Sequence, residues 1–408
     1  MNKRKIIFAA RYYKPCIGGV ENSLYNMCKS ALSMGIDAEI VATNIGLTRK
    51  DYLPLQELDG NITVSRFATT KLPKFLFFLS PLVILLDSYR GFKRIKSMNK
   101  NALIIARTHC IAYAACLVGF DSVVYIVPSL IKGLSDRKDK SLNFKGRFKE
   151  SLILYSTIYV NNWIQKKAII KVDKCYVFSE NMGKQIIELF GNAKSVKPML
   201  IRPGVDSSRF FFDSLRKSEM RKKYNLKEEF IFLCLGRITE TKGFSDVLNA
   251  FYLLPEYLRM KSRVLVVGDG TDSVNLRNIA NNPKISENVV FFDATSCPEE
   301  FFVMADCFMM TSRYEAFGQT IIEAMASGLP IIAYEPDGTN IKTASNELIV
   351  DGVNGFFCQF NIQSLCNTMQ KVINLSVHEY SKIQCTNIEE INKKHSWDSL
   401  VRTVLELT

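Results

Sequence analysis

Two short segments in the second half of the 408-residue chain carry side chains suited to holding an anionic ligand. The first reads Gly236-Arg237-Ile238-Thr239-Glu240-Thr241-Lys242-Gly243 and links a predicted strand at 230–235 to a predicted helix at 244–254. Free backbone N–H groups at a helix N-terminus attract anions, and Arg237 and Lys242 would add charge-assisted hydrogen bonds. The segment therefore predicts a phosphate- or diphosphate-binding loop. The alternative is a solvated loop with two surface cations.

The second segment contains two glutamates, Glu315 and Glu323, separated by seven residues. Glu315 falls in a loop, and Glu323 falls in a helix that Gly318 begins and Gly328 ends. The residues around Glu323 are apolar or small, so its carboxylate is costly to bury unless it accepts hydrogen bonds. The vicinal hydroxyls of a ribose would supply two such bonds. The alternative is that Glu323 caps a neighbouring backbone or faces solvent.

The elements that position these segments follow an alternating pattern of apolar strands and helices. Apolar runs without polar alternation predict parallel strands that are covered on both faces. In the first half these strands are 6–10, 39–42, 103–106, 123–127 and 174–178. In the second half they are 230–235, 264–267, 289–292, 307–310 and 330–333.

The pattern predicts an α/β fold with two doubly wound, Rossmann-like domains, 1–200 and 201–387. Their boundary is expected within 197–213, where prolines and a glycine interrupt regular structure. A C-terminal helix at about 388–408 is expected to pack back on the first domain. Because ligands bind at the carboxyl ends of such strands, the two domains are expected to face an interdomain cleft.

Charge is divided unevenly between the two halves. Residues 1–204 carry a formal charge of +18 and residues 205–408 a charge of −5, in a chain whose net charge is +13. This asymmetry suggests an anionic partner for the first half: a nucleic acid, a membrane surface or a charged substrate. The composition, 47% hydrophobic and 23% charged, is that of a globular protein and excludes wholesale disorder.

Basic residues and aromatic residues are interleaved in two parts of the first half. Residues 71–79 mix lysines with phenylalanines, and Arg90, Lys93, Arg94 and Lys96 follow. Further basic residues lie in 132–174, among Phe144, Phe148, Tyr155, Tyr159 and Trp163. Such a surface suits an anionic membrane interface. The alternative is a solvated basic face over core aromatics.

The remaining composition suggests a cytoplasmic protein, with peripheral binding to the inner face of the membrane as a further expectation. The longest apolar stretch, 75–86, is shorter than the roughly 20 residues that span a bilayer. The eleven cysteines include no CxxC pair, which favours a reducing compartment. With three histidines and no Asp-x-Asp sequence, no metal site is expected.

Together, the two segments resemble the retaining nucleotide-sugar glycosyltransferases of glycosyltransferase family 4, which have the GT-B fold. The Gly-Arg…Lys-Gly segment and the Glu-x7-Glu segment stand about 75 residues apart, as in that family. Three further stretches match the family: Gly268-Asp269-Gly270, Pro203-Gly204-Val205-Asp206 and 346–356. The resemblance is strong over about 200–385 and mainly topological before it.

The resemblance implies a role for each matching residue. Arg237 and Lys242 would bind the donor diphosphate and stabilise its charge as it leaves. Glu323 would hold the ribose, and Glu315 would contact the donor sugar near the reacting face. The other donor-binding positions that the resemblance implies are Gly18, Gly19, Gly268, Gly270, Phe317, Gly318, Gln319 and Thr320.

The first half departs from the family at a histidine. Family members often carry one in the loop that follows the strand at 123–127, where this chain has Pro128-Ser129-Leu130. His109 follows another strand and is the candidate to face the same cleft; the alternative is a structural polar residue at a strand end. Thr311 and Asp293 stand where the family usually has Pro and Gly, and both are expected to alter loop shape.

The activity that the resemblance implies is transfer of a hexosyl unit, with retention and without a metal or other cofactor. The donor would be a nucleotide sugar, with UDP expected and GDP left open. The acceptor would be a glycan or a membrane-associated, lipid-linked molecule in cell-surface polysaccharide or lipopolysaccharide synthesis. Alternatives are a soluble transferase that makes a small glycoside, a phosphorylase-like enzyme, a nucleic-acid-binding protein and a catalytically silent scaffold. No nucleic-acid-binding motif is present, so nucleic acid is not an expected partner.

Overall fold

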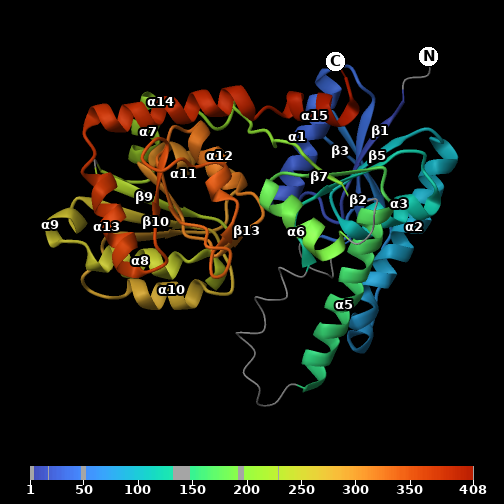
Figure 1. The fold of residues 1–408 in the computed structure, drawn as a ribbon, viewed down its shortest axis with the longest axis horizontal. Coiled ribbons are helices and arrows are strands. Elements are labelled where there is room, and N and C mark those ends of the chain that lie inside the picture. The colour runs from blue at the N-terminus through green and yellow to red at the C-terminus, as the bar shows by residue number, and fades with distance from the viewer. Residues whose placement is uncertain are drawn as a thin grey trace. The chain divides into compact units, whose positions relative to one another are not determined.

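The computed structural model describes residues 4–16, 18–46, 52–131, 148–191, 197–227 and 229–407. The chain divides into two compact units, shown in Figure 1. Unit 1 comprises Met1–Pro203 and Trp397–Thr408, and unit 2 comprises Gly204–Ser396. Each unit is built around its own mainly parallel sheet, so the predicted α/β fold with doubly wound sheets is confirmed.

Unit 1 contains an eight-stranded sheet in the order β3-β4-β2-β1-β5-β6-β7-β8. Every neighbouring pair is parallel except β3–β4, which is antiparallel. The central strands are buried on both faces, as their unbroken apolar sequences predict. The strands are β1 (Ile6–Ala9), β2 (Ala38–Thr43), β3 (Gln56–Asp59), β4 (Ile62–Phe67), β5 (Leu103–Ala106), β6 (Val123–Val127), β7 (Lys174–Val177) and β8 (Pro198–Leu200).

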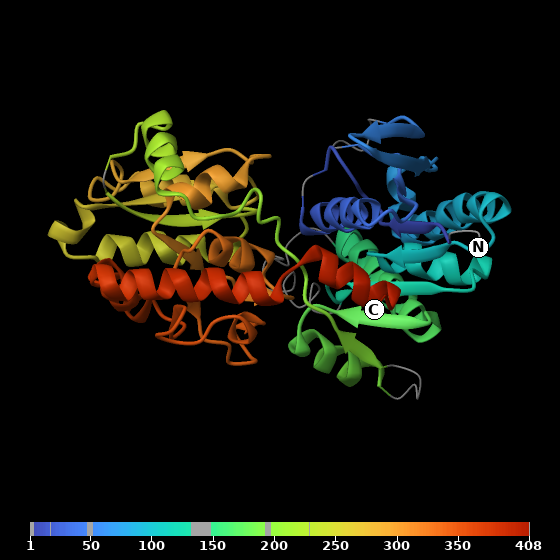
Figure 2. The ribbon, with the colours of Figure 1, turned by 90° about the horizontal axis from the view of Figure 1, so that it is seen from above.

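Helices from both ends of the chain cover this sheet. The C-terminal helix α15 packs on α1, where Ser30 Oγ donates a 2.5 Å hydrogen bond to Asp398 (Figures 1 and 2). None of the described helices combines the length and the apolarity needed to cross a bilayer. The helical elements are α1 (Gly19–Ser33), η1 (Lys74–Leu79), α2 (Ser80–Met98), α3 (His109–Val118), α5 (Phe148–Lys171), α6 (Glu180–Phe190) and α15 (Trp397–Leu405).

Unit 2 contains a six-stranded parallel sheet in the order β11-β10-β9-β12-β14-β16, and a two-stranded sheet, β13-β15. The strands are β9 (Phe230–Leu235), β10 (Ser262–Val267), β11 (Val289–Phe292), β12 (Cys307–Met310), β13 (Tyr314–Glu315), β14 (Ile331–Tyr334), β15 (Lys342–Thr343) and β16 (Gly355–Cys358). The helical elements are α7 (Ser214–Lys223), η2 (Glu240–Lys242), α8 (Phe244–Leu253), α9 (Glu256–Arg259), α10 (Ser273–Ala280), α11 (Pro298–Met304), α12 (Gln319–Ala326), η3 (Ser345–Glu347), α13 (Ile362–Ile373) and α14 (Val377–Lys394).

Two expectations about the chain's organisation need correction. The segment 197–213 is not free of regular structure, because β8 lies in it. Pro198 is tolerated as the first residue of an edge strand, where its missing N–H leaves no ladder bond unmade. The C-terminal return to unit 1 starts at Trp397 rather than near residue 388, since α14 continues to Lys394 and packs on α12 in unit 2.

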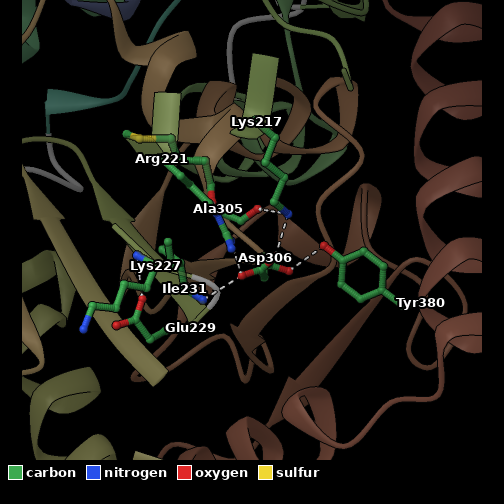
Figure 3. A network of polar contacts seen from close by, with 9 residues as sticks. Lys217, Arg221, Lys227, Glu229, Ile231, Ala305, Asp306 and Tyr380 are labelled. Atoms are coloured by element: carbon green, nitrogen blue, oxygen red, sulfur yellow. Dashed lines mark hydrogen bonds and ion pairs between the residues drawn. The ribbon is translucent and has the colours of Figure 1, made fainter. Parts of the chain in front are cut away.

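A network of charged and polar residues holds the amino ends of the central strands of unit 2 in place (Figure 3). Asp306, directly before β12, accepts 2.6 Å hydrogen bonds from Lys217 and Arg221 of α7 and a 2.8 Å bond from the Ile231 backbone N–H. Its own carbonyl oxygen accepts a 2.9 Å bond from the Tyr380 hydroxyl of α14. One aspartate thus ties two helices and a strand to the amino end of β12.

Candidate active site

The loop that follows β9 contains the first predicted segment. Gly236 (φ 145°) and Gly243 (φ 67°) both have positive φ values, which glycine adopts without steric penalty. A Cβ atom on Gly243 would lie 2.3 Å from the Thr311 carbonyl oxygen, so only glycine fits. The Thr311 hydroxyl donates to the carbonyl oxygens of Lys242 (3.0 Å) and Gly243 (3.1 Å). Thr311, expected only to alter loop shape, thus holds this loop to the end of β12.

Lys242 and Glu315 meet at the carboxyl ends of β9 and β12. Lys242 Nζ lies 2.6 Å from Glu315 Oε2, and both side chains remain partly accessible. The Glu315 strand β13 pairs with β15, and the Arg313 backbone N–H donates to the Thr241 carbonyl at 2.8 Å. Backbone bonds on both sides therefore hold a cation and a carboxylate from distant segments in contact.

Arg237 is the cation of this loop that has no partner among the described residues. Its side chain is exposed, and it makes no hydrogen bond or ion pair with any residue that the structure describes. The alternative interpretation of the segment, two surface cations, fits Arg237 but not Lys242, which is paired. A cation without a protein partner can bind an incoming anion without first breaking an ion pair.

Gly268 and Gly270 bring the loop after β10 against the loop after β9. A Cβ atom on Gly268 would lie 2.0 Å from the Gly236 carbonyl oxygen, and one on Gly270 would lie 2.0 Å from that of Ile238. The Ile238 backbone N–H donates to the Asp269 carbonyl at 2.8 Å. The two glycines are therefore required by close backbone packing, whether or not a ligand also approaches them.

The next four candidate residues, Phe317 to Thr320, lie at the start of α12. Gly318 caps the helix with φ 99°, and Phe317 is buried with its ring centroid 6.2 Å from that of His395. The Gln319 side-chain amide donates to the Gly204 carbonyl at 3.0 Å, which ties the helix to the segment entering unit 2. Thr320 lies in the first turn and is partly accessible. Gln319 is thus engaged by the protein itself, whereas Thr320 remains available.

Glu323 lies on α12 among buried residues, but its own side chain is not fully covered. The surrounding burial raises the pKa of its carboxyl group to about 8. The carboxyl group makes no hydrogen bond to another side chain or to the backbone within the described part of the chain. It therefore does not cap a neighbouring backbone, as one interpretation of the sequence held, and retains its capacity to accept hydrogen bonds.

The unit 1 candidates lie at the carboxyl edge of that unit's sheet. Gly18 and Gly19 begin α1, and His109 begins α3 after β5, the neighbour of β1. His109 Nε2 lies 2.8 Å from Asn161 Oδ1, while Asn161 Nδ2 donates to the Thr157 carbonyl at 2.9 Å. Because an amide oxygen only accepts, Nε2 carries the proton and Nδ1 is left as an acceptor. Burial lowers the pKa of His109 to about 4, so the ring is neutral at physiological pH.

Two residues support the candidate residues through contacts that the sequence does not indicate. Asn161 of α5 orients His109 from 52 positions away, and Gly204 receives the Gln319 amide from 115 positions away. Within the described residues, no group of three or more His, Cys, Asp or Glu side chains is placed to hold a metal ion.

The part of unit 2 that contains the Lys242–Glu315 pair matches a known family. Residues 216–395 match the family model of the Glycosyl transferases group 1. The chain is 31% identical over 176 residues to the GDP-mannose-dependent alpha-(1-6)-phosphatidylinositol monomannoside mannosyltransferase of Mycobacterium tuberculosis. These aligned residues cover 40% of this chain and 44% of that protein. It is 31% identical over 161 residues to the O-antigen biosynthesis glycosyltransferase WclY of Escherichia coli, covering 39% and 42%. The match thus spans less than half the length of these relatives.

A solved structure of low sequence identity matches nearly the whole chain. The structure of Alr3699/HepE of Anabaena, in complex with UDP and glucose, has a TM-score of 0.72 to this chain at 18% identity. The match covers 99% of this chain and 98% of that one. The chain has the GT-B fold of two Rossmann-like domains, and the fold expected from the sequence is confirmed.

Proposed function

We propose that this chain is a retaining glycosyltransferase that transfers a hexosyl unit from a nucleotide sugar to a glycan or lipid-linked acceptor in cell-surface polysaccharide synthesis. The contact between Lys242 and Glu315, beside the glycine loops at the carboxyl ends of β9, β10 and β12, carries this proposal. Two relatives support it, since one is a GDP-mannose-dependent phosphatidylinositol monomannoside mannosyltransferase and the other is an O-antigen biosynthesis glycosyltransferase.

The donor diphosphate is proposed to bind Arg237 and Lys242. Arg237 has no partner in the described part of the chain, whereas Lys242 would exchange the Glu315 carboxylate for a phosphate oxygen. As the bond between the anomeric carbon and the diphosphate oxygen breaks, its electron pair moves to the diphosphate, and both cations stabilise the developing charge. With two cations to neutralise the leaving group, the reaction is proposed to need no metal ion.

Glu315, once separated from Lys242, is proposed to accept hydrogen bonds from hydroxyl groups of the donor sugar. The acceptor hydroxyl oxygen forms the new bond to the anomeric carbon on the face that the diphosphate leaves, which retains the configuration. Its proton passes to the departing diphosphate. His109, neutral and with Nδ1 as an acceptor, is proposed to bind a sugar hydroxyl rather than to supply a proton.

Glu323 is proposed to bind the two ribose hydroxyls of the donor. Its carboxyl group lacks a partner within the described residues, and a diol offers the two donors that an ionised carboxylate accepts. Because the ribose favours the ionised form while the empty site favours the protonated one, nucleotide affinity should rise with pH and level off about one unit above the Glu323 pKa of about 8. From pH 7 to pH 8.5, the gain should be roughly tenfold.

A thermal-shift panel with UDP, GDP, ADP and the corresponding sugar nucleotides tests the proposal. We expect stabilisation by a uridine nucleotide, with guanosine nucleotides as the second choice, and we expect it to persist in excess EDTA. Transfer or slow hydrolysis of one sugar nucleotide should follow the same base preference. No response to any nucleotide would contradict the proposed function, and a strict requirement for a divalent ion would contradict its metal independence.

A further inference from the structure

The outward face of α2 changes character along the helix. Leu82 and Leu86 are exposed in its first half, and Arg90, Lys93 and Arg94 are exposed in its second half. These positions follow the spacing of one helical face. The opposite face packs into unit 1 through residues such as Ile84 and Phe92.

The acidic residue of α2 does not offset these cations at the surface. Asp87 is buried and accepts hydrogen bonds from the Thr70 backbone N–H and hydroxyl, both at 2.8 Å. Arg90 lies 3.8 Å from Asp87 but keeps most of its side chain in solvent, and Lys93 and Arg94 form no ion pair among the described residues. The exposed face of α2 is therefore apolar and then cationic.

The described part of α5 repeats the arrangement. Tyr159 is 75% exposed and Trp163 is 44% exposed, and Lys166 and Lys167 are exposed one turn further on. Residues 156–171 include no Asp or Glu. The Lys167 ammonium lies 5.9 Å from the centroid of the Trp163 ring, so cation and aromatic residue share one patch.

The two helices form one layer with α3, as Figure 1 shows. Ile84 of α2, Cys110 of α3 and Ile164 of α5 form a buried cluster, and Leu85 and Val160 pack against it. Trp163 also makes an edge-to-face contact with Tyr113 of α3, with ring centroids 6.1 Å apart. Large apolar side chains are thus held at the surface by a rigid layer instead of being buried by it.

We propose that the exposed faces of α2 and α5 dock on an anionic lipid membrane. Leucine, tyrosine and tryptophan side chains lower the free energy by entering the interfacial region, and lysine and arginine side chains are attracted to acidic headgroups. An acidic protein partner would match the cations but leave the apolar half of both helices unexplained. This inference goes beyond the proposed transfer reaction and does not depend on it.

The structure narrows the set of residues that the sequence suggested for this role. Tyr159, Trp163, Lys93 and Arg94 reach the surface, whereas Lys96 turns inward to the backbone carbonyls of Val118 and Gly119. Phe144 lies outside the described residues, as do the side chains of Lys74, Phe75, Phe77, Phe148 and Tyr155, and none of them enters the proposal.

Trp163 gives a direct test, because the chain has two tryptophans and the other, Trp397, is buried in unit 1. In a Trp397→Phe variant of the full chain, all tryptophan emission comes from Trp163. Vesicles of phosphatidylglycerol and phosphatidylcholine should shift this emission to shorter wavelength, and brominated acyl chains should quench it. A Trp163→Phe variant should show neither effect. An unchanged Trp163 emission on bound vesicles would overturn the proposal.

Flotation of the full chain with the same vesicles measures the contribution of the cations and the contribution of the apolar side chains separately. Binding to pure phosphatidylcholine vesicles should be at least tenfold weaker than binding to mixed vesicles. The triple variant Lys93→Gln, Arg94→Gln, Lys166→Gln should lose about 100-fold in binding, at about fivefold for each cation. The double variant Leu86→Ser, Tyr159→Ser should lose about tenfold.

Unit 2 supplies matched control variants. Lys222→Gln, Lys261→Gln, Lys382→Gln removes three exposed lysines, and Tyr257→Ser removes an exposed tyrosine. Both controls should bind vesicles like the parent chain, and all variants should keep the parent melting temperature to within about 2 °C. Equal losses in controls and test variants would overturn the proposal. So would nucleic-acid binding as strong as vesicle binding that is unaffected by Leu86→Ser and Tyr159→Ser.

Discussion

Unit 2 contains two lysine–carboxylate contacts of equal length at opposite ends of the same two strands. Lys217 Nζ lies 2.6 Å from Asp306 at the amino end of β12, and Lys242 Nζ lies 2.6 Å from Glu315 beyond its carboxyl end. The two contacts use the same functional groups in the same unit, so their surroundings account for any difference in role.

The surroundings differ in how many bonds fix the carboxylate. Asp306 also accepts from Arg221 and from the Ile231 backbone N–H, whereas Glu315 accepts from Lys242 alone among the residues that the structure describes. A carboxylate with several fixed donors is costly to disturb. A single, partly accessible pair contributes little to stability and can exchange partners. The number of fixed partners therefore separates a structural ion pair from one that a ligand can replace.

The largest expected effect is on the structural side of this comparison. Asp306→Ala leaves the nearly buried Arg221 guanidinium without its carboxylate, which should cost about 3–5 kcal/mol of unfolding free energy. The melting temperature should fall by roughly 10 °C. Urea and thermal unfolding measure the loss. Glu335→Ala, which removes an exposed carboxylate, is the control and should change stability by less than about 0.5 kcal/mol. An equal loss of stability in Asp306→Ala and Glu335→Ala would contradict the structural role assigned to Asp306.

Replacing Lys242 and Lys217 by alanine, one at a time, separates an effect on activity from an effect on stability. Lys242→Ala should lower kcat/KM for transfer by about 10²- to 10³-fold, because it removes a cation that is proposed to stabilise the leaving diphosphate. Its melting temperature should stay within about 2 °C of the parent chain. Lys217→Ala should show the reverse pattern, with reduced stability and near-parent turnover. Near-parent turnover in Lys242→Ala would refute the role proposed for this lysine.

Glu323 provides a pH-dependent test. Its pKa is about 8 in the folded chain, above the ordinary value of 4.5, so the folded state binds more protons than the unfolded state between these values. Stability should therefore fall as pH rises from about 5 to 9. Glu323→Gln should match the parent at pH 5 and exceed it at pH 9 by about 1–2 kcal/mol, a value reduced by the partial solvent access of the side chain. Parallel melting-temperature profiles of the two proteins would contradict the raised pKa.

The smallest expected effect comes from opening the exchangeable pair. Glu315→Gln should change the melting temperature by less than about 2 °C, since a partly exposed ion pair contributes about 0–1 kcal/mol. The nucleoside diphosphate should bind a few-fold more tightly, because Lys242 no longer has a competing carboxylate. Transfer should still fall, since the proposed contact between Glu315 and the donor sugar is weakened. Calorimetric titration with UDP and GDP measures the change, and a loss of diphosphate affinity would argue against exchange at Lys242.

The fold was predictable wherever burial is expressed in a continuous apolar run. The ten predicted strands all occur, because strands covered on both faces contain few polar residues. The six described strands that were not predicted are short, contain polar residues or begin with proline: β3, β4, β8, β13, β15 and β16. Their pairing is determined by neighbours that are distant in the sequence, and no local pattern records it.

The candidate site divides in the same way. The sequence pointed to four of these residues because each type meets a local need for charge or for backbone conformation: Lys242, Glu315, Gly243 and Gly318. The partners that define their state were not. Thr311 holds the Lys242 loop, and Asn161 sets the tautomer of His109, through contacts that link residues 52 to 69 positions apart.

The amino-acid sequence was sufficient to indicate two doubly wound units, a candidate anion-binding loop and a charge division of +18 and −5, since apolar periodicity, glycine positions and ionisable residues are local properties. Tertiary structure decided which charges are fixed and which are free. Asp306 and Glu315 belong to the same chemical class, but only folding surrounds one with three donors and leaves the other with one. It also decided which residues of the cationic half reach the surface, because exposure depends on what each helix packs against.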